Sequence, residues 1–362
     1  MALSDSMDIE QSVVWPSISE VGAWFSPRTC QLSDGRLVMT CQRINGEDGF
    51  EGVHIAWSED GGIRWSEPVP VPSLAREIFP STDGQIWEET VCDVVPSELE
   101  DGRLLLIGQN VYYCNGVLAS ANDNRKTVYT FFGNKAQWSE RKSVQWDAER
   151  AARSLYAGCA QRVQMEDGSI LLPVSHTSME GVRGVGVLRL SVNQNVLEVV
   201  ENSNSLYLDV GLGLIEPSLI EYNKQYWITI RAEDGRGYWS VSDDGLTWPE
   251  MSCWGFDDGA ALVTDSTQQR WVVVKDKLCL IYTRKDPMNE RVFRWRAPLW
   301  ISEVENGTLL RLSEERVLPA VEDPLIQIGN FHAISLKDGS GFVTVSEVGE
   351  FFSGRTLLAK IN

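Results

Sequence analysis

The amino-acid sequence predicts an all-β fold, a single six-bladed β-propeller that spans residues 1–362. Short runs of β-branched and aromatic residues alternate with turn pairs along the whole chain, the pattern of strand, turn and strand. Helical periodicity is weak, and one segment, 147–158, could form one or two helical turns. The 14 tryptophans indicate repeated core positions or surfaces that stack on sugars.

The hairpin turns recur at a nearly constant spacing. Each is a polar two-residue turn that follows an apolar strand and precedes a hydrophobic one. They lie in segments 33–39, 100–107, 166–173, 222–230, 275–282 and 337–345. Successive turns are roughly 53 to 67 residues apart, and a repeat of about 60 residues with about four strands is typical of one propeller blade. A pair of β-sandwiches is the alternative architecture.

Composition excludes several classes of protein. Charged residues make up 23% of the chain and hydrophobic residues 43%, which is typical of a globular protein with a large core. The sequence contains no apolar run long enough for a transmembrane helix. The net charge of −19 disfavours nucleic-acid and membrane partners. The first residues contain no secretory signal, so we expect a cytoplasmic protein, or a secreted one if a leader has been removed. The oligomeric state stays open.

Cysteine and histidine usage predicts no metal centre and no cofactor. The seven cysteines are scattered without a C-x-x-C pair, and the three histidines show no zinc-binding spacing. The acidic loop Asn45–Asp48 could supply oxygen ligands to a calcium ion, which leaves that possibility open.

Two segments share a turn motif. Ser58–Trp65 reads S-x-D-x-G-x-x-W, and Val241–Trp248 repeats the pattern with Asp243 at the Asp position. We expect the Asp side chain to cap backbone N–H groups, Gly to adopt positive φ and Trp to pack over the turn. This motif resembles the Asp-box of BNR-repeat proteins, and the chain resembles the sialidase-like superfamily. In that family the motif is structural and lies at the edge of a blade.

One predicted hairpin brings together a carboxylate and a guanidinium. Its turn is centred on Asn223–Lys224, midway between Glu216 and Arg231. Backbone pairing therefore places these two residues opposite each other at the open end of a blade. A structural ion pair and a functional pair are both consistent with this pattern.

Other arginines lie at corresponding ends of other blades. Arg28 precedes the first hairpin turn, and Arg294 and Arg296 alternate along a later predicted strand. If these side chains converge on the propeller axis, they form a cationic site in an acidic protein. Such a site suits a carboxylate that is bound through two hydrogen bonds.

The resemblance to sialidases implies roles for these residues. It implies that Arg28, Arg231 and Arg294 bind a carboxylate, that Asp48 or Glu51 is the acid/base, and that Glu216 orients or activates the nucleophile. The family's Tyr nucleophile on the last blade has no counterpart here, because no Tyr follows Tyr282. The corresponding stretch contains Asn330 and His332.

The remaining candidates are acids, histidines and a tryptophan. Glu88 or Glu89 would give a second carboxylate across the axis from Glu216, as a glycosidase needs. Trp87 could stack on a sugar. His176 and His332 could act as proton carriers.

These residues predict an exo-acting glycoside hydrolase for a terminal sugar that carries a carboxylate. Two alternatives remain. One is a uronate lyase, in which His332 or His176 with a Tyr moves the proton. The other is a non-catalytic glycan-binding propeller. The predicted partner in each case is a glycan or a small acidic sugar.

Overall fold

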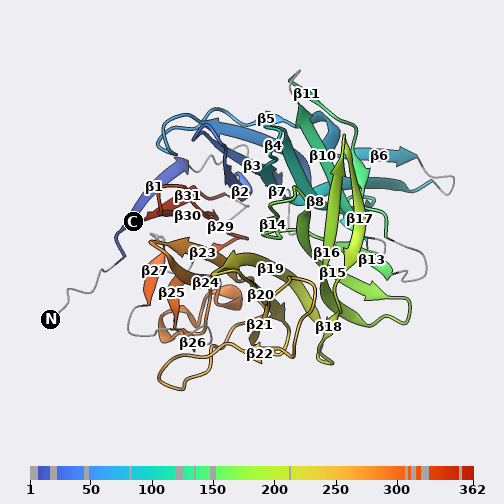
Figure 1. Cartoon of the computed structure of the whole chain (residues 1–362). Coiled ribbons are helices and arrows are strands. Elements are labelled where there is room, and N and C mark those ends of the chain that lie inside the picture. Colours follow the sequence, from blue (N-terminus) through green and yellow to red (C-terminus); the bar gives the residue numbers. More distant parts are fainter. Residues whose placement is uncertain are drawn as a thin grey trace.

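The structure is a computed structural model of the whole chain. It describes residues 7–16, 23–44, 49–80, 84–119, 125–133, 136–146, 152–211, 213–305, 309–310, 315–318, 326–349 and 353–362. The chain is almost entirely β, and its sheets are arranged around a centre as a β-propeller (Figure 1), which confirms the predicted all-β propeller class but not the predicted number of blades.

Five of the sheets are each formed by one continuous stretch of chain. The first contains β2 (Phe25–Gln31), β3 (Leu37–Ile44), β4 (Phe50–Ser58) and β5 (Val69–Pro70). The second contains β6 (Glu77–Pro80), β7 (Ile86–Glu98), β8 (Leu104–Cys114), β9 (Val117–Leu118), β10 (Thr127–Gly133), β11 (Gln137–Trp138) and β12 (Lys142–Ser143). The third contains β13 (Ala152–Tyr156), β14 (Val163–Gln164), β15 (Ile170–Ser178), β16 (Arg183–Asn193), β17 (Val196–Asn202) and β18 (Leu206–Tyr207).

The next two sheets follow the same plan. The fourth contains β19 (Leu214–Tyr222), β20 (Gln225–Ala232), β21 (Gly237–Ser242) and β22 (Ser252–Cys253). The fifth contains β23 (Arg270–Val274), β24 (Lys277–Tyr282), β25 (Leu299–Glu305), β26 (Leu309–Leu310) and β27 (Arg316–Leu318). Short 3₁₀ helices lie at Pro72–Leu74, Pro287–Asn289 and Phe293–Trp295. Within the described residues, no helix has the length and apolar character that crossing a bilayer requires.

The last sheet differs from a simple repeat because it joins the two ends of the chain. It contains β28 (Gln327–Ile328), β29 (His332–Ser335), β30 (Gly341–Val348), β31 (Thr356–Ile361) and β1 (Ile9–Trp15). Strand β1 pairs antiparallel with β31, from Ile9 opposite Ile361 to Trp15 opposite Thr356. Because β1 supplies the outer strand, residues near both ends of the chain hold the ring closed (Figure 1).

Each of the predicted polar turns joins the inner strand of a sheet to its neighbour. The pairs are β2–β3, β7–β8, β14–β15, β19–β20, β23–β24 and β29–β30. The predicted hairpins are therefore confirmed. The helical expectation for 147–158 is wrong in its described part, because β13 pairs with β15 there instead.

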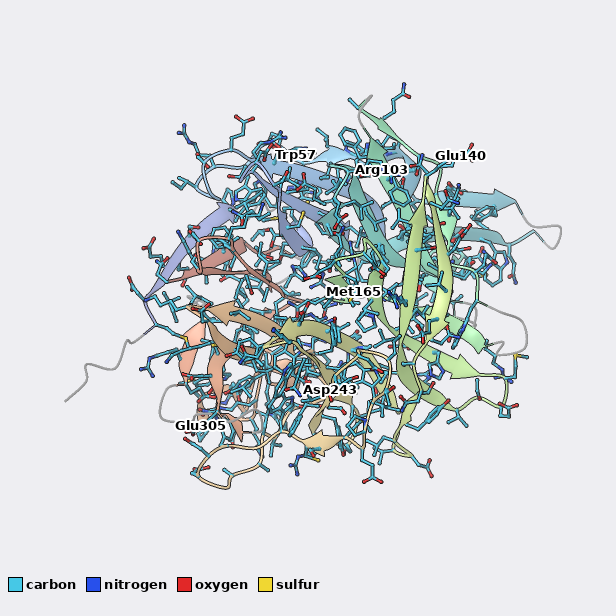
Figure 2. All side chains as sticks on the ribbon, in the orientation of Figure 1. Trp57, Arg103, Glu140, Met165, Asp243 and Glu305 are labelled. Atoms are coloured by element: carbon cyan, nitrogen blue, oxygen red, sulfur yellow. The ribbon has the colours of Figure 1, made fainter. Side chains whose placement is uncertain are left out.

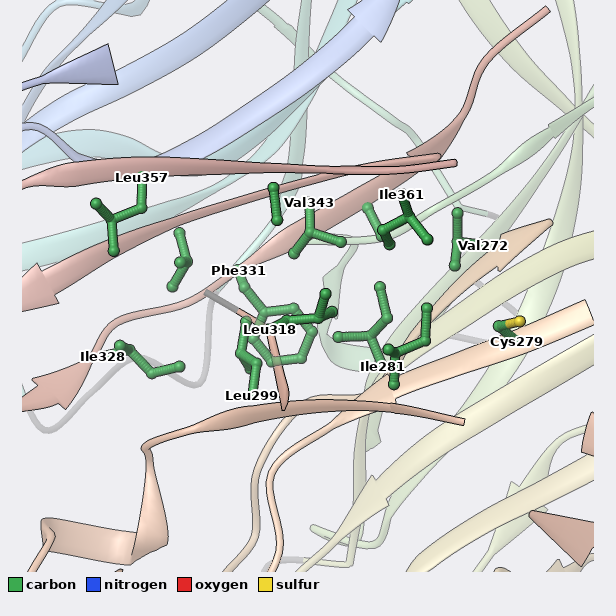
Figure 3. Close-up of a cluster of buried hydrophobic side chains, with 14 of the residues drawn as sticks. Val272, Cys279, Ile281, Leu299, Leu318, Ile328, Phe331, Val343, Leu357 and Ile361 are labelled. Carbon is green, nitrogen blue, oxygen red and sulfur yellow. The ribbon is translucent and has the colours of Figure 1, made fainter. Parts of the chain in front are cut away.

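Hydrophobic clusters fill the spaces between neighbouring sheets. One cluster joins β23, β24 and β25 to β29, β30 and β31 (Figure 3). Others lie between the first and second sheets, the second and third, and the third and fourth. Figure 2 shows side chains throughout these spaces, with Trp57, Glu140 and Glu305 on the outer side of the ring. Burial of apolar area between the sheets stabilises the ring, and the inner strands are left to surround a central site.

The two motif turns are built by the hydrogen bonds expected for them. Asp60 accepts from the backbone N of Arg64 at 2.9 Å, and the indole of Trp65 donates to the carbonyl of Gly62 at 3.1 Å. In the second turn Asp244, not the predicted Asp243, accepts from the backbone N of Thr247 at 2.7 Å. The reason is that Ser242 takes the first position of the motif, which shifts the capping Asp by one residue.

Candidate functional site

A pocket of about 550 Å³ opens at the centre of the ring. Residues that line it lie on β2, β7, β16, β19 and β20 and in the segment before β29. Among the described residues, the fifth sheet contributes no strand residue; its part of the lining comes from the segment before β25. The charged residues that line it are Asp93, Glu216, Glu233, Arg125, Arg183, Arg231, Arg294 and Arg296. Five arginines against three carboxylates make the lining cationic in a protein with a net charge of −19.

A left-handed residue recurs where inner strands reach this centre. Ser26, Asp93, Cys159, Glu216 and Ser266 have φ between 46° and 67°. Register shifts interrupt β2, β7 and β19 at the first, second and fourth of these positions. A bulge re-aims a side chain, and non-glycine residues with positive φ store strain that often marks functional sites. Three of the five residues, including both carboxylates, line the pocket.

Asp93 forms the floor of the pocket, and Arg28 lies behind it. Its Oδ1 accepts hydrogen bonds from Arg28 Nη2 at 2.8 Å and from Asn330 Nδ2 at 3.2 Å. Burial by itself raises the pKa of Asp93, but the adjacent Arg28 guanidinium and the hydrogen bonds from Cys159 and Asn330 together hold that pKa below its usual value. Asp93 is therefore an ionised carboxylate at neutral pH.

Arg28 is less accessible than the sequence pattern leads us to expect. Its side chain is completely buried, and its remaining contacts are the Phe331 carbonyl and Cys159 Sγ. The bulge after Phe25 directs it inward, where Asp93 covers it. Arg28 thus supports the floor and does not line the pocket.

Glu216 and Arg231 lie together, as the hairpin predicts. Arg231 Nη1 donates to Glu216 Oε2 at 2.9 Å, and both side chains line the pocket. The backbone partner of Arg231 is Ile215, because the bulge at Glu216 shifts the register by one residue. Burial raises the pKa of Glu216, but the charge and hydrogen bond of Arg231, together with the charge of Arg270, hold that pKa below its usual value.

Arg294 and Arg296 also line the pocket, but not from the predicted strand. Arg294 lies in the 3₁₀ helix Phe293–Trp295 with φ of 53°, and it donates to the carbonyl of Asp265 at 2.9 Å. Strand β25 begins only after Pro298, which lacks the N–H that a strand interior requires. The Ser266 hydroxyl accepts from Arg231 Nε at 3.0 Å, so these arginines share one wall.

The opposite wall was not apparent from the sequence. It carries Arg125 and Arg183, with Tyr156 between the second and third sheets. The Arg125 guanidinium lies 5.7 Å from the Tyr156 ring centroid. Burial raises the pKa of Tyr156, and the two arginines oppose that shift, which places all three groups near one another.

Other predicted site residues lie away from the pocket. Glu51 pairs with Arg76 at 3.5 Å, and Glu89 accepts from Asn110 at 2.7 Å; neither lines the pocket, and Trp87 does not line it either. Their partners explain this, because Glu51 faces Arg76 and Glu89 faces Asn110 and Arg141. Asp48 lies outside the described residues.

The two candidate histidines are also held elsewhere. His332 is buried, and its Nδ1 accepts from the backbone N of Thr29 at 3.2 Å. His176 lies 3.0 Å from the Ser205 hydroxyl and packs against Tyr207. Neither lines the pocket, so the geometry gives no support to a lyase in which one of them is the base. Among the described residues, no His, Cys, Asp and Glu side chains form a group able to hold a metal ion.

Asp93 could have been found from the repeat. It lies eight residues before Asp101 of its hairpin turn, and Ser26 and Cys159 lie eight residues before Asp34 and Asp167. Glu216 lies eight residues before Lys224. Alignment of these four turns therefore identifies one axial position in each of four repeats.

Comparison with solved structures shows a common architecture. The Trypanosoma rangeli sialidase in complex with the inhibitor DANA aligns with a TM-score of 0.66 and 14% identity, over 97% of this chain and 59% of that one. The structure titled "NanB plus Optactamide" aligns with a TM-score of 0.68 and 11% identity, over 100% of this chain and 71% of that one. A protein of unknown function from Dyadobacter fermentans aligns with a TM-score of 0.71 and 14% identity, over 99% of both chains.

The fold is sialidase-like. The chain spans about three fifths of the length of the Trypanosoma rangeli sialidases that it matches. No family model matches the sequence, and no curated protein matches it. At these identities the sialidase-like fold is shared, and the chemistry has to be argued from the pocket.

Proposed function

We propose that this protein is an exo-acting glycoside hydrolase for a terminal sugar that carries a carboxylate. The observation that carries the proposal is the arrangement of Asp93 and Glu216, two carboxylates from separate sheets that face one arginine-rich pocket. A pocket with a closed floor accepts the end of a glycan, and a volume of about 550 Å³ lies within the usual range for small-ligand sites.

Glu216 is suited to act in its ionised form. Arg231 keeps it charged, so it can stabilise the positive charge of an oxocarbenium-like transition state or activate the attacking group. A proton must also reach the leaving oxygen. Asp48, the predicted acid/base, lies outside the described residues; within them, Glu233 is the third carboxylate that lines the pocket and the group that could deliver this proton.

A panel of aryl glycosides tests this proposal. Sialosides and uronides are compared with neutral glycosides, arabinosides among them, and release of the aryl group is followed by absorbance. We expect at least one acidic glycoside to be cleaved about tenfold faster than its neutral counterpart. No release from any member of the panel would overturn the proposal. Growth of the unsaturated-uronate absorbance instead would identify a lyase, and binding without turnover would identify a glycan-binding propeller.

A further inference from the structure

The positive charge of the pocket is not distributed evenly over its walls. On one wall, Arg231 and Arg294 lie within electrostatic range of Glu216 and Glu233. On this wall, Arg294 Nη2 also donates hydrogen bonds to the carbonyls of Asp265 and Ser266. Most of the charge there is balanced by groups of the protein.

The opposite wall, which contains Arg125, Tyr156 and Arg183, has no such balance. Within the described part of the chain, neither guanidinium forms an ion pair with a carboxylate. Arg125 Nε is buried and has no hydrogen-bond partner there. A buried N–H without a partner costs free energy, so this wall favours a group that accepts hydrogen bonds, and its two positive charges favour an anion.

Neutral hydroxyl groups complete this wall. Ser154 and Thr177 line the pocket beside Tyr156, and the Ser154 hydroxyl donates to Thr177 Oγ1 at 2.9 Å. Backbone contacts fix the arrangement, because the N–H of Leu155 donates to the carbonyl of Arg125 at 2.9 Å, and Thr177 is the strand partner of Arg183. Two guanidinium groups surrounded by hydroxyls suit a sugar that carries a carboxylate.

The floor excludes the other obvious place for that carboxylate. Arg28 Nη2 is already paired with Asp93 Oδ1 at 2.8 Å, and Asp93 lies between Arg28 and the pocket. A ligand carboxylate that approached Arg28 would first meet the negative charge of Asp93.

We infer that the carboxylate of the sugar binds on the wall formed by Arg125 and Arg183, and not over Arg28. This inference rests on the proposed function for the kind of ligand, but it concerns binding and not turnover. The sugar ring then lies between that wall and the pair of Glu216 and Arg231.

Paired probes that differ in one charge test the inference. Binding of D-glucuronic acid and N-acetylneuraminic acid to the full chain is measured by calorimetry and compared with binding of their methyl esters. We expect the wild type to prefer at least one acid over its ester by roughly tenfold or more, the effect of a charge-assisted hydrogen bond. Arg183→Gln and Arg125→Gln should each reduce that preference to about twofold or less.

Two further variants serve as comparisons. Arg294→Gln removes a charge from the opposite wall and should keep the preference for the acid. Arg64→Gln removes an arginine whose side chain is 88% exposed and which pairs with Asp60 in a surface turn, so it should match the wild type. Thermal unfolding checks that every variant is folded.

Preference for the acid that survives in both Arg183→Gln and Arg125→Gln, or that disappears in Arg294→Gln alone, would overturn the inference. Failure of both acids to bind the wild type at millimolar concentration would also overturn it. Loss of the preference in the predicted variants, without turnover of any aryl glycoside, would support the inference and refute the hydrolase. If an acidic glycoside is turned over but the preference for the acid is lost only in Arg294→Gln, the hydrolase is supported and the inference about the carboxylate is refuted.

Discussion

Asp93 and Arg28 form an ion pair at the centre of the propeller, with 2.8 Å between Oδ1 and Nη2 and almost no exposure of either side chain. The residues lie 65 positions apart, on the inner strands of two neighbouring sheets. The pair therefore links two sheets and holds Asp93 in place at the floor of the pocket.

Loss of the Asp93 charge should destabilise the protein. Asp93→Asn keeps the shape and tolerates the positive φ, but it leaves the Arg28 guanidinium buried without a counter-charge. We expect a loss of about 2–4 kcal/mol in the free energy of unfolding, measured in urea. The double variant Arg28→Met with Asp93→Asn should recover much of that loss, since no charge is then buried.

The exposed pair of Asp34 and Arg36 is a matched control. It has the same N–O distance of 2.8 Å, but about half of each side chain is exposed. Asp34→Asn should cost less than about 1 kcal/mol, because water screens the pair. Equal losses in the two Asp→Asn variants would show that burial of the Asp93 pair carries no special weight.

Glu216→Gln should abolish most of the activity while the protein stays folded. Its carboxylate is the charged group that Arg231 holds in the pocket, and removal of a group that acts in the transition state costs about 10²–10⁴-fold. The measurement is kcat on an aryl glycoside that the wild type cleaves. Glu303→Gln, which removes a carboxylate paired with Lys277 at 2.8 Å outside the pocket, should leave kcat unchanged. Comparable loss in both variants would remove Glu216 from the mechanism.

The repeat and one wall of the site could be predicted from the sequence. The turn spacing and the alternation of apolar runs are local patterns, and each sheet forms around its own hairpin, so the propeller follows from them. The pair of Glu216 and Arg231 could be predicted for the same reason, because one turn sets the register of both residues. These are relationships within a single hairpin.

Relationships between sheets were not predictable in the same way. Whether Arg28 faces the pocket or lies behind Asp93 depends on bulges in two separate strands, and no local pattern shows a bulge. Arg125 and Arg183 both lie near Tyr156 because the segment before β10 runs beside β13, an arrangement that forms only in the folded ring. For the same reason, the sequence could not show that Glu51 and Glu89, which have the right chemistry, lie outside the pocket.

Acid should destabilise the protein through its buried histidines, His176 and His332, whose pKa values burial lowers. Burial lowers the pKa of His176 to about 4, whereas an unfolded His titrates near its usual value of about 6.5. Between these two values the unfolded chain binds the proton more readily, so stability falls as the pH falls from about 6.5 to about 4. The loss attributable to this group is on the order of 3 kcal/mol or less.

Urea unfolding at pH 7.5, 5.5 and 4.5 measures this dependence. His176→Gln keeps a hydrogen-bonding group near Ser205 but cannot titrate, so its stability should fall less than that of the wild type over the same range. The carboxylates whose pKa values are lowered, such as Asp93, contribute their loss at lower pH, as the pH falls below about 4. Identical pH profiles for the wild type and His176→Gln would show that this histidine does not control the dependence.

Lys224→Gly should stabilise the protein. Asn223 and Lys224 form the two-residue turn between β19 and β20, and both have positive φ, at 51° and 61°. A turn of this kind favours Asn-Gly, and the left-handed conformation destabilises a residue with a Cβ by about 1–2 kcal/mol. Glycine offsets about 0.4–1 kcal/mol of the stabilisation, because it loses more conformational entropy on folding. The net gain should be about 0.5–1 kcal/mol in urea unfolding.

Two glycine substitutions distinguish this effect from a general one. Asp276→Gly, at φ of 63° in the corresponding turn between β23 and β24, should also stabilise the protein. Lys360→Gly, within β31, should destabilise it, since a strand interior gains nothing from glycine and loses side-chain packing. A loss of stability in both turn variants would mean that the lysine and aspartate side chains contribute more to these turns than their backbone strain costs.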